Sequence, residues 1–549
     1  MEKGVGDGLA SESATVAPST DDAQPEPIPL LRFGLLCLGV CLGLFLAMID
    51  TSIVATSLYI IGIEFNDLDN VNWIALAYTL AYMGCAVVFS RISDIVGRRN
   101  AFVAAYVLFF AFSLACGWAR NMSQMIAFRA VQGVGGSGLY SLTMIMLPEM
   151  SPEHLTQHIG AMVGLVVAVS GVLGPVLGGV LTRYASWRWV FWIKYVWPPP
   201  GSQGSPPMLT PARHSGPIGA VSLAIFFLSW PQEKYRPVLI KHSWKELDFP
   251  GSLLTIAAAV LVVFAFQNTG ASSSSNEGNN WSSPVFIAAL VVGLVCWVAL
   301  FSWEYLVERY FEARIAPVFP IRLFRRGIYA PGAINTLLNG FPYILLIYAV
   351  PLRIQVVGGK SPLLAGAMML PMLVAVAVAS ALSGAANAKR QIIVETMVVG
   401  SCLMLLGCGL LTTLSVEELD TAKLLVFTAF CGFGFGLTVS ASTMIAAHED
   451  ERDYEPLEAP AQGILAQFRI FGGSLGIAAS TAMLRTELIG IPTTKSKSDG
   501  IQTEMMTRMA YARAFQKDMV AATAITGLAV VTIFLALWQS RKRGYKLSR

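Results

Sequence analysis

Long apolar segments constrain this chain more than any other feature of its sequence. Hydrophobic residues fill 55% of its 549 positions and charged residues only 13%, which is too apolar for a water-soluble globular protein. A helix of roughly 20 apolar residues crosses a bilayer core. We therefore predict an all-α polytopic membrane protein with fourteen transmembrane helices, one of them interrupted, at about 33–57, 71–90, 101–118, 124–147, 158–181, 187–228, 250–267, 283–303, 328–350, 362–384, 391–413, 423–447, 462–484 and 518–539.

The charges between these segments predict their orientation in the membrane. Residues 1–32 are rich in Ser, Pro and acidic types, which is typical of a disordered tail. The loop 91–99 carries three arginines, whereas the preceding loop 64–69 is acidic. Because positive loops stay in the cytosol, the N-terminus is expected there. An even number of helices returns the basic tail 541–549 to the same side.

Small residues crowd one face of the fifth apolar segment. Glycine and proline weaken helices in water, but in a bilayer neighbouring helices re-satisfy the freed amide groups, and small residues let two backbones approach closely. This face is therefore predicted to be a packing surface or a hinge. Its clustered residues are Gly171, Gly174, Pro175, Gly178 and Gly179.

Two charged residues deep inside apolar segments are candidates for a functional role, Asp50 in the first segment and Arg129 in the fourth. A charge at such a depth costs several kcal/mol unless it faces a polar cavity or a partner, which favours a functional role. Burial disfavours the charged form of a carboxyl group, so Asp50 is expected to bind and release a proton. The alternatives are that Asp50 is permanently paired with Arg129, and that Arg129 extends to the outer headgroups.

The loop after the second segment contains the pattern Asp-x-x-Gly-Arg-Arg, formed by Asp94, Gly97, Arg98 and Arg99. Glycine permits a tight turn, and the carboxylate can pair with the arginines or with the positive end of a helix. A basic cytosolic turn without a special role is the alternative.

Together these motifs resemble the major facilitator superfamily. The Asp94 pattern is similar to its signature loop, in which a polar cluster latches two halves on the cytosolic side, although Ser90 stands where a glycine is usual. Arg129-x-x-Gln132-Gly-x-Gly resembles the fourth-helix motif, whose arginine is implicated in proton coupling. Gly174-Pro-x-x-Gly-Gly resembles the fifth-helix motif of proton-driven exporters.

The first apolar segment narrows the resemblance to fourteen-span drug:proton antiporters. Leu46-x-x-x-Asp50-x-x-Ile-Val is similar to their first helix, although Tyr59 stands where a proline is usual. Gln467-Phe-Arg469 to Gly476 resembles their penultimate helix. Arg469 lies near the predicted cytosolic end, so the sequence leaves open whether it serves the transport site or anchors to headgroups.

The resemblance implies a major facilitator fold of two pseudosymmetric six-helix bundles, 33–228 and 311–540, joined by two linker helices in 229–310. It implies a substrate site near the midplane between the bundles and alternating access by rocking. The protein is expected to be a monomer. Its transport is expected to be driven by a proton gradient, without a bound cofactor. Candidate residues for the cavity lining are Tyr78, Gln132, Asn335, Asn339, Tyr343 and Gln355.

From this resemblance we predict proton-coupled export of drugs, toxins or secondary metabolites across the plasma membrane. A vacuolar amino-acid transporter or a siderophore transporter of the same fold is the alternative, and a non-transporting membrane sensor is a third reading. No nucleophile, metal-ligand or phosphate-binding spacing is present, so neither an enzyme nor a metal site is expected. The small net charge of +4 points to no nucleic-acid partner. Asn280-Trp-Ser is a candidate glycosylation site.

The sixth segment is interrupted by 194–216, a stretch with a triple proline through which no continuous helix can form. In family members, sequences similar to the two flanks of this stretch follow each other directly. We therefore hypothesise that residues 194–216 are encoded by a retained intron. The codons of Lys194-Tyr-Val permit a fungal-type donor, those of Leu209-Thr a branch sequence, and those of His214-Ser an acceptor. A genuine lineage-specific loop is the alternative, and an abundant transcript that keeps these codons would favour it.

Overall fold

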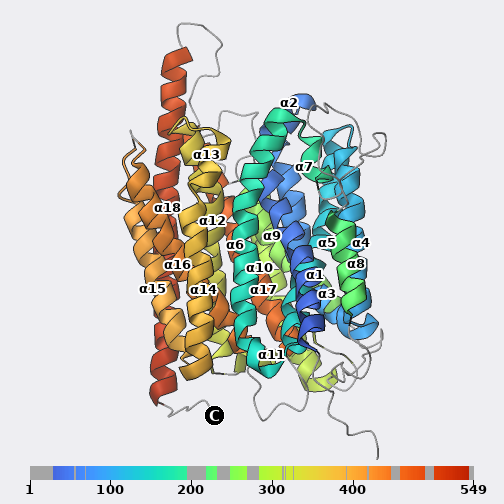
Figure 1. Cartoon of the computed structure of the whole chain (residues 1–549). Helices are drawn as coiled ribbons and strands as arrows, with labels where there is room; N and C mark the ends of the chain where they lie inside the picture. The colour runs from blue at the N-terminus through green and yellow to red at the C-terminus, as the bar shows by residue number, and fades with distance from the viewer. Residues whose placement is uncertain are drawn as a thin grey trace, which may run out of the picture.

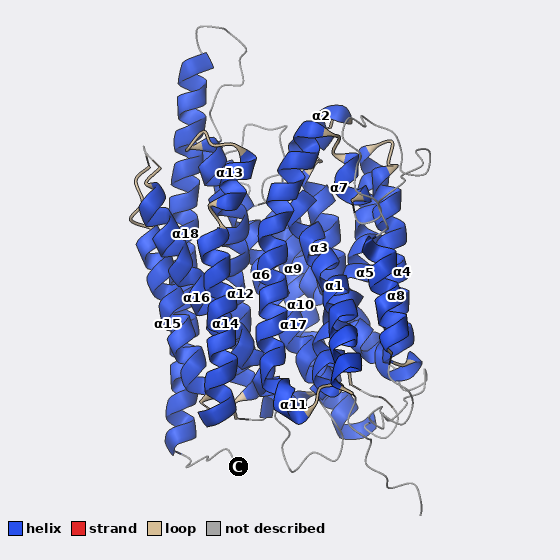
Figure 2. Ribbon diagram, in the orientation of Figure 1, coloured by secondary structure: helices blue, strands red, loops and turns tan. Residues whose placement is uncertain are grey.

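All regular elements that the structure describes are helices (Figure 2). This computed structural model describes residues 29–54, 57–67, 70–193, 218–230, 248–268, 283–311, 315, 317–325, 327–390, 392–416, 419–446, 458–488 and 500–542. The all-α prediction is confirmed for these ranges. The predicted insertion 194–216, Asn280 and most of both predicted tails lie outside them.

The helices follow one another along the whole described chain. Helix α1 begins inside the predicted tail 1–32, because two leucines extend its apolar run toward the N-terminus. The elements are α1 (Leu30–Ile53), α2 (Leu58–Glu64), α3 (Asn72–Val96), α4 (Arg98–Gly117), α5 (Met122–Glu149), α6 (Glu153–Tyr184), α7 (Arg188–Trp192), α8 (Ile218–Ser229), α9 (Phe249–Asn268), α10 (Pro284–Leu306) with a π-helical turn (Val307–Phe311), α11 (Ile321–Arg325), α12 (Tyr329–Val356), α13 (Pro362–Ala367), α14 (Leu370–Arg390), α15 (Ile393–Leu411), α16 (Thr421–Ala446), α17 (Glu458–Leu488) and α18 (Gly500–Lys542).

Eleven of the described helical stretches are long and apolar enough to cross a membrane. They coincide with eleven of the fourteen predicted segments. The other three correspond to α5, α17 and the pair α7 and α8. Helices α5 and α17 have 28 and 31 residues but are less apolar, because most of their side chains are buried against neighbouring helices and few face outward. Fourteen spans therefore remain a prediction.

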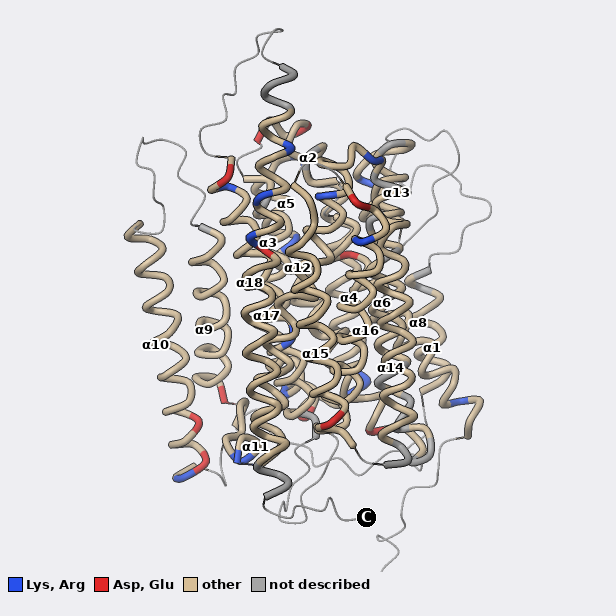
Figure 3. The backbone as a smooth tube through the Cα atoms, turned by 90° about the vertical axis from the view of Figure 1, so that its left-hand side faces the viewer, with Lys and Arg blue, Asp and Glu red and all other residues tan. Residues whose placement is uncertain are grey.

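The helices pack in two groups with different neighbours (Figure 1). One group consists of α1, α3, α4, α5, α6 and α8, and the other of α12 and α14 to α18. In the figure α1, α3, α4, α5 and α8 lie to the right, α12, α14, α15, α16 and α18 to the left, and α6 and α17 in the middle. Helix α6 lies between the groups and contacts α13, α14 and α16, while α3 and α5 contact α17. Helices α9 and α10 pair with each other and stand beside the bundle, where α9 touches α3 and α17 (Figure 3).

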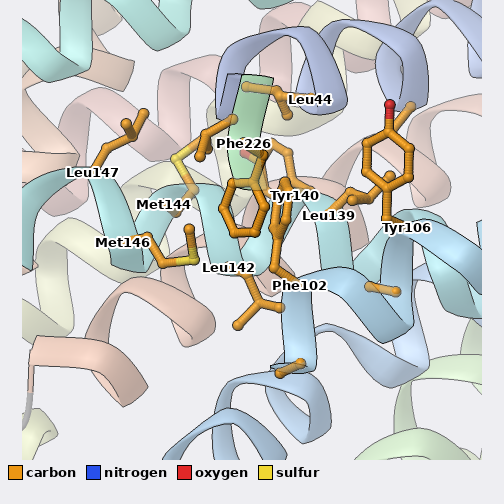
Figure 4. Packing of buried hydrophobic residues seen from close by; sticks show 14 of the residues in the cluster. Leu44, Phe102, Tyr106, Leu139, Tyr140, Leu142, Met144, Met146, Leu147 and Phe226 are labelled. Atoms are coloured by element: carbon orange, nitrogen blue, oxygen red, sulfur yellow. The ribbon is translucent and has the colours of Figure 1, made fainter. Parts of the chain in front are cut away.

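Helices α7 and α8 pack along successive parts of one neighbour, α4. The Ser113 hydroxyl donates to the Phe191 carbonyl of α7 at 3.1 Å, and the Tyr106 hydroxyl donates to the Gly219 carbonyl of α8 at 2.8 Å. Further along α8, the ring of Phe226 packs against Phe102 at a centroid distance of 4.6 Å (Figure 4). The two pieces therefore follow one path antiparallel to α4.

The outward surface of the bundle is apolar along the middle of the helices. Lysine, arginine, aspartate and glutamate gather mainly toward the two ends of the helices (Figure 3). On α10, Val291, Leu294, Val295 and Val298 are each about half exposed or more. Such a belt suits lipid and not water, as expected of a multi-pass membrane protein.

Two buried carboxyl groups lie where the pair α9 and α10 meets the chain leading to α11. A Cβ atom built on Gly251 would lie 2.2 Å from Asp248 Oδ2 and 2.9 Å from Glu304 Oε1, so both carboxyl groups flank this glycine. Trp303 Nε1 donates to Asp248 Oδ1 at 2.8 Å, and the Phe319 amide donates to Glu304 Oε1 at 2.9 Å. The second oxygen of each carboxyl group has no hydrogen-bond partner in the described part of the chain.

Candidate functional site

A cavity of about 130 Å³ lies between the two groups of helices. Side chains from α1, α3, α5, α6, α12, α14, α16 and α17 form its wall. The lining is apolar and aromatic, and Arg469 is the one charged side chain among the described residues that line it. Its tyrosines include Tyr78, Tyr82, Tyr140 and Tyr343.

Polar contacts between segments far apart in the sequence lie toward both ends of this cavity. Near one end, the Tyr348 hydroxyl of α12 donates to the Thr51 carbonyl of α1 at 3.1 Å. Near the other end, Arg91 of α3 donates to the Pro317 carbonyl. A drug-sized ligand typically fills about 300–1,000 Å³, so the groups have to separate before the cavity can admit one.

Asp50 and Arg129 form a fully buried ion pair beside this cavity. Their exposed fractions are 0% and 1%, and Arg129 Nη1 contacts Asp50 Oδ2. The alternative that Arg129 extends to the outer headgroups is therefore wrong, because its guanidinium is held inside the protein. The pairing that the sequence left open is present. Whether Asp50 also releases a proton is a separate question, and that role stays a prediction.

Neutral groups complete the environment of Arg129. Its Nε donates to the Ile74 carbonyl at 3.2 Å, and its Nη1 donates to Gln132 Oε1 at 2.9 Å. The ring of Tyr78 lies below the guanidinium, 4.2 Å from its central carbon. Since Tyr78 also lines the cavity, one side chain contacts both the ion pair and the cavity.

The small-residue face of α6 packs against both groups of helices. A Cβ atom on Gly174 would lie 1.9 Å from Ser52 Oγ of α1, so only glycine fits there without displacement. A Cβ atom on Gly171 would lie 3.6 Å from Leu373 of α14, an ordinary contact distance. Gly178 is buried and Gly179 is partly exposed, while the side chain of Pro175 is not described.

The predicted signature loop forms a buried charge cluster. Gly97 separates α3 from α4 with a φ of +92°, a conformation that favours glycine. Arg98 bonds to Asp94 and also binds Glu149 at the end of α5 through two bonds of 3.0 and 2.7 Å. Arg99 does not join this cluster and lies 5.1 Å from the ring centre of Phe227 in α8.

Glu149 was missed by the sequence reasoning. One signal was available: α5 is antiparallel to α4, so the end of the fourth apolar segment returns to the side of the membrane where α4 begins. A carboxylate at that end is well placed to meet the arginines of the loop.

Four of the six candidate cavity residues lie elsewhere. Asn335 and Asn339 both donate to Ser401 Oγ, at 2.9 and 3.0 Å, because their helix face turns toward α15. Gln132 is turned toward Arg129, and Gln355 is half-buried near the end of α12. Only Tyr78 and Tyr343 of that set line the cavity described above.

Comparison with known proteins gives matches in sequence and in fold. Residues 40–196 match the family model of the Major Facilitator Superfamily. The chain is 29% identical over 513 residues to the MFS-type transporter FPY5 of Fusarium mangiferae, covering 89% of this chain and 81% of that protein. It is 28% identical over 475 residues to the efflux pump FUS6 of Gibberella fujikuroi, covering 85% and 78%.

Among solved structures, the human organic anion transporter MFSD10 has a similar fold. Its TM-score is 0.55 at 13% sequence identity, covering 92% of this chain and all of that one. A helical bundle with an apolar outer belt is that of a multi-pass membrane protein, and its relatives in sequence are membrane transporters. The chain is thus similar to the Major Facilitator Superfamily over residues 40–196 and to MFS-type transporters over most of its length. It is accordingly a transporter and not an enzyme.

Proposed function

We propose that this chain is a proton-coupled exporter of small organic compounds such as drugs, toxins or secondary metabolites. It acts as a monomer in the plasma membrane, with both termini in the cytosol. Fourteen spans, arranged as six, two and six, rock about a central cavity. The fully buried pair of Asp50 and Arg129 beside that cavity is the observation that carries the proposal.

The buried pair supports proton coupling because its two members differ chemically. Arg129 stays charged at any accessible pH, whereas a carboxylate can bind a proton. A proton on Asp50 removes the attraction within the pair and leaves Arg129 with the Ile74 carbonyl, Gln132 and the Tyr78 ring. Protonation therefore acts on Arg129, and through it on Tyr78, a residue of the cavity wall.

The contacts between the two groups of helices support alternating access. Near the two ends of the cavity, the hydrogen bonds from Tyr348 to Thr51 and from Arg91 to Pro317 are ones that a rocking motion can break and re-form. The glycines of α6 allow it to pack closely on α1 and on α14. Such smooth surfaces can slide or rock with little steric cost.

Export as the direction of transport is supported by the printed names of the relatives. One of the two is an efflux pump and the other an MFS-type transporter. The apolar, aromatic lining of the cavity suits amphipathic organic molecules better than strongly hydrated ones.

Accumulation assays test the transport proposal directly. Cells with and without the gene are exposed to a panel of fluorescent dyes and toxic compounds, and the compounds that accumulate less are taken into vesicles with an imposed pH gradient. We expect Asp50→Asn to lose gradient-driven transport yet keep exchange without a gradient, because Asp50 does not line the cavity. An Asp50→Asn variant that pumps like the wild type contradicts the coupling scheme.

Asp420→Asn is the matched control for this experiment. Asp420 lies outside the apolar stretch of α16, where a hydrogen bond from Lys423 lowers the pKa of its carboxyl group. It is ionised throughout the neutral range and lies far along the chain from the cavity wall. Its neutralisation should leave transport unchanged.

A further inference from the structure

Arg469 is a buried cation in the wall of the cavity. It belongs to α17, the helix that contacts α3 and α5 of one group and α12 of the other. Its exposed fraction is 7%, and it lines the cavity between the groups. Its position rules out the headgroup anchor that the sequence left open.

The partners of Arg469 are all neutral. Its Nη1 donates to the Tyr140 hydroxyl and its Nη2 to the Ser442 hydroxyl, each at 2.9 Å. Its Nε has no acceptor, and no carboxylate lies within 4.0 Å, among the residues that the structure describes. Arg129 provides the contrast, since Asp50 neutralises it at a similar degree of burial.

A buried cation without a counter-charge is expensive, and the cost is recovered only when an anion arrives. Three further polar atoms of the cavity wall are buried without a hydrogen-bond partner in the described ranges: the hydroxyl oxygens of Tyr82, Tyr343 and Ser474. A few polar groups that converge in an otherwise apolar cavity are the usual arrangement of a ligand site.

The rest of the wall selects an aromatic or apolar body for the ligand. Tyr343 and Phe435 stack with their ring centres 3.5 Å apart, and Tyr82 and Tyr140 lie 6.0 Å apart. A ligand that satisfies this wall has a flat apolar part and a single oxygen anion.

We propose that Arg469 binds an anionic group of the transported molecule, such as a carboxylate on an aromatic scaffold. This inference rests on the proposed transport through the cavity and names its substrate class. The guanidinium supplies the counter-charge and a free Nε donor, and the unpartnered hydroxyl groups can donate to the same anion. Because Tyr140 and Ser442 come from different groups of helices, an anion held by Arg469 lies where the two groups meet.

Calorimetric titration of the full-length protein in detergent tests this inference. The probes are acid and amide pairs with the same scaffold: 1-naphthaleneacetate and 1-naphthaleneacetamide, with the matching indole and biphenyl pairs. We expect the wild type to bind the acids at least about tenfold more tightly than the amides. Arg469→Gln should weaken acid binding about 10- to 100-fold and leave amide binding within about threefold, while Arg469→Lys keeps most of the preference.

Arg353→Gln is the control for losing a buried arginine. Arg353 donates to the Ser415 carbonyl, is almost fully buried and does not line the cavity. Its substitution should leave the ratio of acid to amide affinity unchanged even if the protein becomes less stable.

Several outcomes overturn the inference. A wild type that binds acids no more tightly than amides, or that binds none of the probes, contradicts it. So does an Arg469→Gln variant that weakens both members of each pair equally, which would indicate a structural role. If transport is proton-driven but shows no preference for acids, only this inference is refuted. If acids are preferred but transport is not proton-driven, only the proposed coupling is refuted.

Discussion

Breaking the pair of Asp50 and Arg129 should destabilise the protein in an asymmetric way. Both side chains are fully buried, and removing one partner of a buried pair costs about 3–5 kcal/mol because the other charge is left behind. Asp50→Asn leaves an arginine that cannot lose its charge. The remaining carbonyl, amide and ring contacts of Arg129 place the expected loss near the lower limit, about 3 kcal/mol.

Arg129→Met leaves a carboxylate, which can escape its burial cost by binding a proton. We therefore expect Arg129→Met to be less damaging than Asp50→Asn, and its defect to shrink as the pH falls. The double variant Asp50→Asn and Arg129→Met contains no buried charge at this site and should recover to within about 1 kcal/mol of the wild type.

Thermal unfolding of the four purified proteins, at about pH 8 and about pH 5, measures this cycle. At the higher pH the expected order of Tm runs from the wild type and the double variant, through Arg129→Met, to Asp50→Asn. At the lower pH the Tm of Arg129→Met should move toward that of the double variant. If the double variant is as unstable as the sum of the single ones, or if Asp50→Asn melts like the wild type, the reasoning about the buried pair is refuted.

Four further substitutions test the packing and the charge clusters, each by its effect on Tm. Gly174→Ala should cost about 1–3 kcal/mol because its Cβ has no room, whereas Gly171→Ala should stay within about 0.5 kcal/mol; equal effects would contradict the packing of α6. Glu149→Gln should cost about 1–3 kcal/mol, since it weakens both bonds to the loop arginine, and an unchanged Tm would show that the cluster adds no stability. Glu304→Gln should raise the free energy of unfolding by about 1 kcal/mol, and the Tm with it, because its amide can donate to the unpartnered oxygen of Asp248; a lower Tm would be the contrary result.

The sequence predicted the helices well because the bilayer leaves few choices. A long apolar run must form a helix, since no water is available for its backbone groups. The same cost singled out Asp50 and Arg129 among 72 acidic and basic side chains. This reasoning is weaker for α5 and α17. These helices are surrounded mostly by protein and not by lipid, so they contain fewer apolar residues.

Apart from the pair of Asp50 and Arg129, which the sequence offered as an alternative, the pairings between distant helices could not be predicted from the sequence. They depend on the rotation of each helix about its axis, where a shift of one residue turns a side chain by about 100°. This is why Asn335 and Asn339 were placed in the cavity and instead bind Ser401. Arg469 was left between two readings for the same reason, because the sequence does not say which face of α17 meets the cavity.

One column of aromatic rings connects Arg129 with Arg469. Arg129 lies over Tyr78, the rings of Tyr78 and Tyr82 are 5.7 Å apart, those of Tyr82 and Tyr140 are 6.0 Å apart, and Tyr140 accepts a bond from Arg469. Arg129 has its own carboxylate at one end of this column, and Arg469 has none at the other among the residues that the structure describes. An arginine that is paired with a carboxylate of the protein suits a site where that carboxylate binds and releases a proton. An arginine without such a carboxylate suits a site that attracts an anionic ligand. The difference in charge compensation therefore assigns the proposed proton to Asp50 and the proposed substrate anion to Arg469. The three tyrosines connect the two sites through ring contacts.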